Sequence, residues 1–289
     1  MGLRDVLVVL GDGPISEGCL RLATRIARQQ EASLSAVFLP SERTVPSRVA
    51  NRAPHFALTP ETSSGLVAAA LWKDTEHRDE AELLERRFRD CIRGSDRGGE
   101  WYCLDRPDRA ALANLAKAAD LVVTGQVDPA VGAVPRWYRP EDIVVSCGRP
   151  VLMVPYVGTF TELGQRVLVA WDGSREAVRA LNDSLPIIAA ARMVTLMTIR
   201  PYSRGFQSER IAMQNMLRHL KRHDVFARID ETLRGESAIH DVLLSRSVDL
   251  AVDMIVAGAY HRSPVWEALI GGVSRGLLRH MTVPVLLSH

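Results

Sequence analysis

Asp253-Met-Ile-Val-Ala-Gly258, followed by Val283-Pro-Val-Leu-Leu-Ser288, is the second copy of a pattern that this chain contains twice. The first copy reads Asp120-Leu-Val-Val-Thr-Gly125, followed by Arg149-Pro-Val-Leu-Met-Val154. The interval from Asp to Pro is 30 residues in the first copy and 31 in the second. Self-similarity over the length of a domain predicts two copies of one fold.

The beginnings of the two copies match as well. Asp5-Val-Leu-Val-Val-Leu-Gly-Asp-Gly13 corresponds to Arg166-Val-Leu-Val-Ala-Trp-Asp-Gly173, and each is an apolar run that ends in Asp-Gly. In the second copy, short apolar strands alternate with helices of ten or more residues, a pattern typical of a parallel sheet covered on both faces. The predicted strands are 166–171, 193–199, 225–229, 254–257 and 283–287, and the predicted helices span about 177–188, 206–222 and 236–247. The sequence therefore predicts an α/β protein with two tandem five-stranded parallel sheets of the Rossmann-like or flavodoxin-like kind.

The predicted domains are 1–155 and 165–289, joined by a linker at 156–164. A chain of 289 residues has the length of about two ordinary domains. The first copy is longer, because Asp12 and Asp120 are 108 residues apart whereas Asp172 and Asp253 are 81 apart. The extra length falls in about 40–65, a proline-containing stretch without periodicity, which we interpret as an inserted loop. Its role is open: a lid, an interface or an unstructured segment.

Composition argues against several classes of protein. No apolar run approaches the ~18 residues that span a bilayer, and the run Val6 to Leu10 is too short for a signal peptide, so we expect a cytoplasmic protein that binds no membrane. The net charge of +2, from 36 basic and 34 acidic residues, produces no field that would attract nucleic acid. The four cysteines, Cys19, Cys91, Cys103 and Cys147, lack paired spacing and are expected to be reduced thiols.

In open parallel sheets, ligands bind beyond the carboxyl ends of the strands, where the strand order reverses. Two segments of the second copy are expected there: Asp172-Gly173-Ser174, and the stretch from Gly258 to Ser274. Small residues let backbone amides approach an anion, and a helix N-terminus adds unpaired N–H groups. We therefore predict a phosphate-binding loop in the second copy. The first copy has no Gly pair after Gly125 and is interpreted as a degenerate half.

At these residues the chain resembles a tandem universal stress protein, with two UspA-type domains of the adenine nucleotide alpha hydrolase-like fold. Nucleotide-binding members of that family carry Gly, two residues, Gly, nine residues, Gly, then Ser or Thr. This chain has the same frame, with Gly258, His261, Gly271 and Gly272 at the four positions. The resemblance covers almost the whole chain and is strongest over 165–289.

The resemblance implies a site for ATP or a related adenine nucleotide, with or without magnesium. Asp172, with its neighbour Gly173, would face the adenine and ribose, and Ile199 would offer backbone groups to the base. The residues expected around the ribose and phosphates are Gly258, His261, Gly271, Gly272 and Ser274. The alternative is structural: Gly271 and Gly272 only let the loop pack, and Asp172 only caps the next helix.

Two residues depart from the family pattern. His261 places a ring where the family has glycine, at a cost if the backbone needs a positive φ. Gly272 lacks the hydroxyl that would bond a phosphate, for which Ser274 is a substitute. Trp171 and Trp266 flank the expected site as candidates to stack on a base or as core residues.

Three functions follow as alternatives. The first is a stress-response binding protein regulated by an adenine nucleotide in the second domain, acting on an unknown protein partner. The second is a nucleotide-independent scaffold or small-molecule sensor. The third is a weak ATPase or a nucleotidyl-transfer enzyme, ranked last because no catalytic residue is identified. His219 and His223 have the spacing of a metal pair but no third ligand nearby in sequence, so no metal site is predicted.

The resemblance also implies an interface. Similar proteins join their domains through the edge strands nearest the C-terminus of each copy, here Val151–Val154 and Val283–Leu287, so we expect the two domains to pair within one chain as a pseudo-dimer. Such pairing would remove two exposed sheet edges. A further homodimer of the whole chain is left open.

Overall fold

The computed structural model describes residues 2–40, 79–94, 97–104, 108–128, 138–200, 207–259 and 272–289, with only the backbone of 207–209. The first half contains β1 (Asp5–Gly11), α1 (Ile15–Gln30), β2 (Ser33–Leu39), β3 (Trp101–Cys103), α4 (Arg109–Ala118), β4 (Leu121–Gly125), α5 (Pro140–Ser146) and β5 (Val151–Val154). The second half contains β6 (Arg166–Ala170), α6 (Arg175–Ile188), β7 (Met193–Arg200), α7 (Gln207–Arg222), β8 (Ala227–Leu233), α8 (Ile239–Asp249), β9 (Met254–Gly258), α9 (Gly272–His280) and β10 (Val285–Ser288). Residues 79–92 are also helical.

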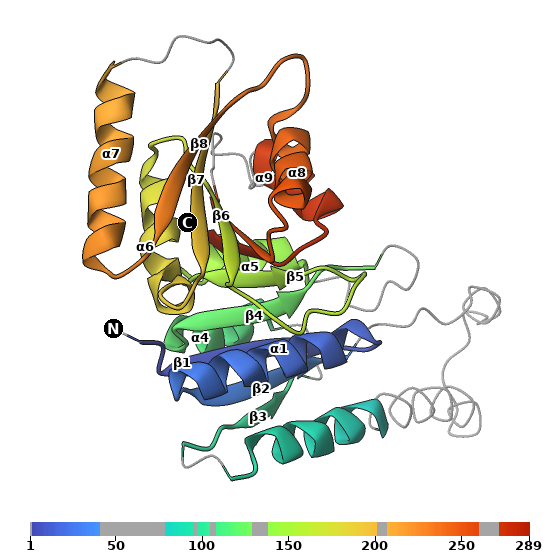
Figure 1. Ribbon diagram of the computed structural model, residues 1–289. Coiled ribbons are helices and arrows are strands. Elements are labelled where there is room, and N and C mark those ends of the chain that lie inside the picture. Colours follow the sequence, from blue (N-terminus) through green and yellow to red (C-terminus); the bar gives the residue numbers. More distant parts are fainter. Residues whose placement is uncertain are drawn as a thin grey trace, which may run out of the picture.

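One ten-stranded sheet runs through both halves, in the order β3-β2-β1-β4-β5-β10-β9-β6-β7-β8 (Figure 1). Read outward from the middle, the two halves have the same strand order. Neighbouring strands are parallel except at the centre, where β5 and β10 are antiparallel and Met153 faces Val285. The predicted pairing of the two domains through these strands is therefore confirmed, and it converts two sheet edges into one continuous ladder.

Helices cover both faces of the sheet, as expected for parallel strands. Figure 1 shows α6 and α7 on one side of the second-half strands and α8 and α9 on the other. In β1, Val8 and Leu10 belong to the core under α1, whereas Leu7 and Val9 belong to the core under α4 and α5. The strands in the middle of the sheet thus contribute alternate side chains to two apolar layers, which explains why they are mostly apolar, whereas the edge strand β8 carries Arg228, Asp230 and Glu231.

The Asp of the repeated sequence pattern fixes the start of a neighbouring strand. Asp120 Oδ2 accepts the backbone N–H groups of Arg4 and Asp5, at 2.8 and 3.2 Å, just before β1 and within its first residue. Asp253 accepts those of Gly164, Gln165 and Arg166, at 2.7, 2.9 and 3.0 Å, before β6. The two copies therefore keep this carboxylate because it satisfies amides that no strand partner reaches.

Several boundaries differ from the sequence-based expectations. β8 covers Ala227–Leu233 rather than 225–229, and α8 begins at Ile239 rather than at 236. Gly235, at φ +59°, turns the chain between them, and this turn places 236–238 outside the helix. The sequence predicts five strands in the first copy but does not locate the third, the short strand β3, since three residues carry no detectable periodicity. Of the expected loop at 40–65, residues 41–65 lie outside the described ranges.

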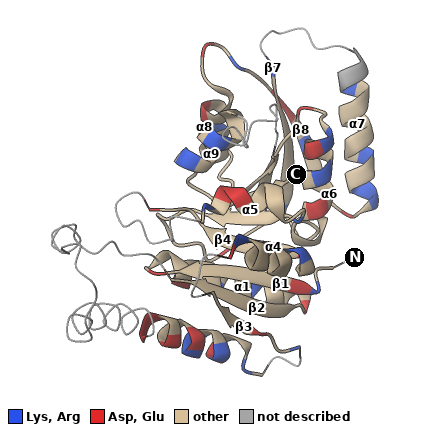
Figure 2. Cartoon of the chain, turned by 180° about the vertical axis from the view of Figure 1, so that it is seen from behind, with Lys and Arg blue, Asp and Glu red and all other residues tan. Residues whose placement is uncertain are grey.

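Charged residues of both signs are interspersed on the helices and connecting segments (Figure 2). In the helical stretch 79–92, Arg86 pairs with Glu82 and Arg89 with Glu85, each one turn apart and solvent-exposed. Such pairs contribute a few tenths of a kcal/mol each, about 0.3–0.5. This charged stretch is therefore a solvated helix face, as its sequence suggests. None of the helices in the described ranges is long and apolar enough to cross a membrane.

Candidate functional site

A cavity of about 790 Å³ opens at the carboxyl ends of β6, β7 and β9. Its apolar lining includes Trp171, Met197, Ile199, Leu243 and Leu277. Its polar lining comprises Asp172, Ser174, Arg234, His240 and Ser274. The volume falls in the range of about 300–1,000 Å³ that is typical of small-molecule sites.

Asp172 lies exposed at the end of β6, on the rim of this cavity. Its Oδ1 accepts the N–H of Ser174 at 2.9 Å, across Gly173, which adopts φ +77°. The cap of α6 is Ser174, whose Oγ accepts the N–H of Ala177 at 3.1 Å. The alternative in which Asp172 caps the helix is therefore wrong, because Ser174, two residues later, does so.

Gly258 brings the end of β9 against the first turn of α6. A Cβ on Gly258 would lie 2.6 Å from the carbonyl carbon of Glu176 and 2.7 Å from the nitrogen of Ala177. Ser274, nearly buried in α9, approaches the Gly258 carbonyl oxygen with its Oγ at 3.5 Å. Gly272 opens α9, and a Cβ there would meet no described atom within 4 Å. Close packing in the described part thus requires glycine at 258 but not at 272.

Most of the predicted site residues share the cavity. Asp172, Ile199, Gly258, Gly272 and Ser274 line it, and Gly173 stands between two lining residues. His261, Gly271 and Trp266 lie outside the described residues. Trp171, 8% exposed, forms part of the apolar wall.

Two basic residues of the cavity were missed by the sequence analysis. Arg234 follows β8, and His240 is the second residue of α8. The signal that could have found them is topological: the third strand of a parallel unit ends at the same edge of the sheet as the first and fourth.

Comparison with known proteins agrees with this geometry. Residues 164–289 match the model of the universal stress protein family. These residues form a universal stress protein domain. The full chain has the fold of a universal stress protein from Archaeoglobus fulgidus, with a TM-score of 0.69 at 14% identity over 98% of this chain and 95% of that one. It is also similar in fold to a functionally unknown Pseudomonas aeruginosa protein, with a TM-score of 0.56 at 15% identity over 99% of this chain and 92% of that one. No curated protein matches the chain by sequence.

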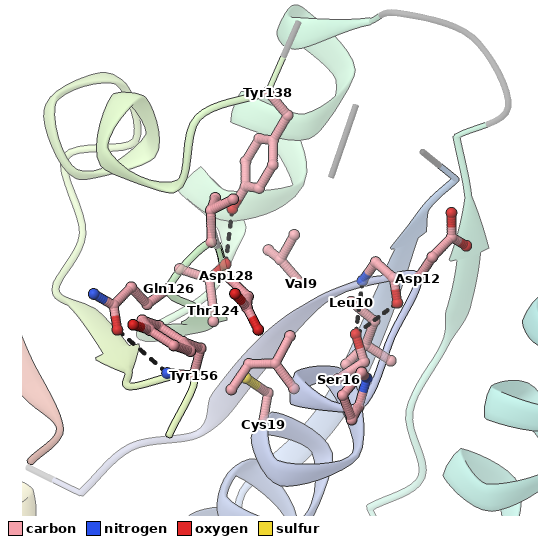
Figure 3. A pocket seen from close by; sticks show the side chains of 15 residues that line it. Val9, Leu10, Asp12, Ser16, Cys19, Thr124, Gln126, Asp128, Tyr138 and Tyr156 are labelled. Carbon is pink, nitrogen blue, oxygen red and sulfur yellow. Dashed lines mark hydrogen bonds between the residues drawn. The ribbon is translucent and has the colours of Figure 1, made fainter. Parts of the chain in front are cut away.

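The first half has a much smaller cavity than the universal stress protein domain at the corresponding edge. About 40 Å³ remain between the ends of β1 and β4, beside Ile15, Cys19 and Tyr138 (Figure 3). The Tyr138 hydroxyl lies 2.8 Å from Thr124 Oγ1, and burial raises the pKa of Tyr138, which keeps the phenol neutral. Such a space holds about one or two water molecules. The described part of the first half leaves no room there for a nucleotide.

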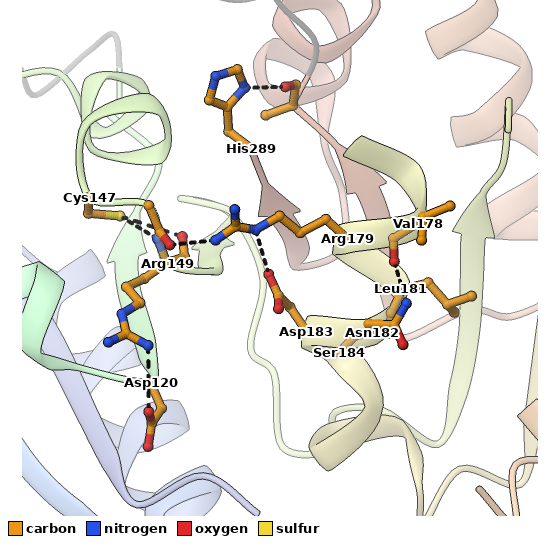
Figure 4. A network of polar contacts seen from close by, with 12 residues as sticks. Asp120, Cys147, Arg149, Val178, Arg179, Leu181, Asn182, Asp183, Ser184 and His289 are labelled. Carbon is orange, nitrogen blue, oxygen red and sulfur yellow. Dashed lines mark hydrogen bonds and ion pairs between the residues drawn. The ribbon is translucent and has the colours of Figure 1, made fainter. Parts of the chain in front are cut away.

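Polar contacts join the universal stress protein domain to the first half. Arg179 of α6 donates from Nη2 to the carbonyl oxygen of Gly148 at 2.7 Å and pairs through Nε with Asp183 at 3.4 Å (Figure 4). Gln126, buried after β4, donates from Nε2 to the carbonyl oxygen of Leu278 at 2.8 Å. Because Leu278 lies in α9, the helix whose N-terminal end lines the cavity also contacts the first half at its other end.

Within the described ranges, no cluster of three or more His, Cys, Asp or Glu side chains has the arrangement of a metal site. His219, in α7, and His223, just after its end, have ring centroids 4.6 Å apart. His219 Nε2 is 3.2 Å from the side-chain oxygen of Asn182. His219 therefore contacts α6.

Proposed function

We propose that this protein is a stress-response binding protein whose second half holds an adenine nucleotide. The observation that carries the proposal is the contrast between the two copies of the fold. The cavity at the carboxyl ends of the strands measures about 790 Å³ in the second half and about 40 Å³ in the first. Only the larger of these two cavities has the volume that a nucleotide needs.

The lining of the larger cavity suits the parts of a nucleotide. Trp171 and Ile199 offer apolar surface to a base, and Trp is the side chain best able to stack on one. Asp172 offers carboxylate oxygens to ribose hydroxyls at the rim. The first residues of α9, Gly272 and Val273, bring a helix N-terminus to the same space, where unpaired N–H groups favour a phosphate.

Binding without turnover is the form of the proposal that the described residues favour. Phosphoryl transfer requires positioned metal ions together with charge-stabilising side chains. Among the described residues that line the cavity, Asp172 is the one carboxylate. Regulation would follow if occupancy changes the position of α9, which Gln126 of the first half contacts. The protein partner, a homodimer and the cytoplasmic location remain predictions.

The test is calorimetric titration of the full chain with ATP and magnesium, preceded by native mass spectrometry of protein purified without added nucleotide. We expect one adenine nucleotide per chain. Asp172→Ala should weaken binding roughly ten- to a hundredfold, because a hydrogen bond to a charged group contributes about 1.5–3 kcal/mol. Asp172→Asn keeps an acceptor for the Ser174 amide and separates this loss from a disturbed turn.

Asp90→Ala is the matched control, since Asp90 is an exposed carboxylate of the first half, 62% accessible. It should leave affinity unchanged. No retained ligand and no binding at millimolar ATP would reject the nucleotide and favour a scaffold or a sensor of another small molecule.

A further inference from the structure

The segment from the end of β8 to the first turn of α8 forms part of the cavity wall. Arg234, directly after β8, and His240, the second residue of α8, both line the cavity, and neither belongs to the family's glycine-rich loop. Asp172 is the acidic residue of the described lining.

Hydrogen bonds hold Arg234 in place. Its backbone N–H donates to the carbonyl oxygen of Arg200 at 2.7 Å, which extends the pairing of β7 and β8 by one residue. Its side-chain Nε donates to the carbonyl oxygen of Ser237 at 3.0 Å, across the turn at Gly235. The turn thus fixes the base of the guanidinium group while the residue stays exposed at the cavity.

No carboxylate of the described part of the chain forms an ion pair with Arg234. The neighbouring Arg200 differs, because it pairs with Glu231 at 3.6 Å. A guanidinium group presents five N–H donors in a planar fork, and Nε uses one of them here. The two terminal nitrogens of Arg234 are therefore available to an anion that enters the cavity.

His240 is held rigidly within this segment. Its ring lies against Gly276 of α9, where an added Cβ would approach ring atoms within 2.5–2.6 Å. It also stacks on His280, with ring centroids 6.1 Å apart and planes 11° apart. A side chain larger than hydrogen at 276 would displace the ring, so the packing of α8 on α9 sets its orientation.

We propose that Arg234 binds the phosphate group of the nucleotide, in the cavity that His240 also lines. This inference rests on the proposed function and names the group that recognises the anionic end of the ligand. Arginine suits this role because its fork matches phosphate oxygens in a bidentate manner. The positive charge that binds the phosphate comes from Arg234 at the end of β8. Phosphate binding therefore does not require the hydroxyl that is missing at Gly272.

The experiment compares three ligands, adenosine, AMP and ATP, by calorimetric titration of the full chain. For Arg234→Ala we expect about tenfold weaker binding of AMP and ATP, and unchanged binding of adenosine, because adenosine has no phosphate. Arg234→Lys keeps the charge without the fork and should recover part of the loss. Added salt should weaken ATP binding more in the wild type than in Arg234→Ala.

Arg192→Ala is the control. Arg192 is an exposed arginine just before β7, at the amino ends of the strands and therefore opposite the cavity. It should change none of the affinities. Equal losses for adenosine and ATP in Arg234→Ala, or no loss for ATP, would overturn the role of Arg234 while leaving nucleotide binding intact. A wild-type protein that binds none of the three ligands would instead overturn the proposed function itself, and this inference with it.

Discussion

At the scale of single residues, Gly272 is the departure from the family pattern that the structure can assess. A Cβ at this position meets no described atom within 4 Å, so a serine side chain has room at the start of α9. Its hydroxyl would stand where the helix N-terminus already favours a phosphate. The nearby Ser274 lies in different surroundings from residue 272, because its Oγ faces the carbonyl oxygen of Gly258 at 3.5 Å, which is a long contact.

We predict that His261→Gly combined with Gly272→Ser tightens nucleotide binding several-fold, by restoring the family pattern. A neutral hydrogen bond of about 1 kcal/mol corresponds to roughly a fivefold change in affinity. Gly272→Ser alone separates the added hydroxyl from the removed ring, and titration calorimetry measures both variants. Unchanged affinity in the double variant would show that neither departure impairs the site.

At the scale of elements, Asp120 and Asp253 perform one task in the two copies with different numbers of partners. Asp253 satisfies three backbone N–H groups before β6, whereas Asp120 satisfies two at the start of β1 and also lies 3.9 Å from Arg149. Asp120 directly precedes β4, which pairs with β1, and Asp253 directly precedes β9, which pairs with β6. The start of β6 therefore depends on its Asp more strongly than the start of β1.

Asp253→Ala should lower the free energy of unfolding by about 2–3 kcal/mol, and Asp120→Ala by about 1 kcal/mol, because each unsatisfied amide costs free energy in proportion to its burial. Urea denaturation of both variants, followed by circular dichroism, gives the comparison. Because the two sites are internal repeats, each variant is the control for the other. A larger loss at Asp120 would contradict this account.

At the scale of the whole molecule, the two copies share one sheet. The antiparallel pairing of Leu286 with Leu152 lies at its centre, and both side chains are fully buried. Arg179 reaches the carbonyl oxygen of Gly148 from the second half, and Gln30 reaches that of Pro186 from the first, at 2.7 and 2.8 Å. An interface of this kind couples the stabilities of the two halves.

We predict a single cooperative transition when the full chain is unfolded by heat in a calorimeter, with the calorimetric enthalpy equal to the van't Hoff enthalpy. Gln126→Ala should lower the midpoint of that transition without splitting it, because it leaves the Leu278 carbonyl oxygen without this donor. Two resolved transitions in the wild-type protein would show that the halves unfold independently.

The amino-acid sequence by itself determined the architecture of the chain. The repeated Asp, apolar run and Pro indicated two copies of a parallel α/β unit, and alternating short strands and long helices located most elements. The resemblance to tandem universal stress proteins, rather than any pattern of residues, indicated β5 and β10 as the joined strands. Periodicity, proline positions and the spacing between the two copies are local or repeated features, so they can be detected in the sequence without the structure.

Only the tertiary structure decided how large the cavity of each copy is and which side chains line it. Ile15 and Tyr138 line the small cavity of the first half, and the volume of that cavity cannot be read from any spacing of residues in the sequence. Ser174 rather than Asp172 caps α6, a choice made by backbone geometry after Gly173. Arg234 and His240 reach the cavity because β8 ends beside β7 at the same sheet edge. Contacts between residues far apart in the chain depend on strand order and packing, which local sequence does not encode.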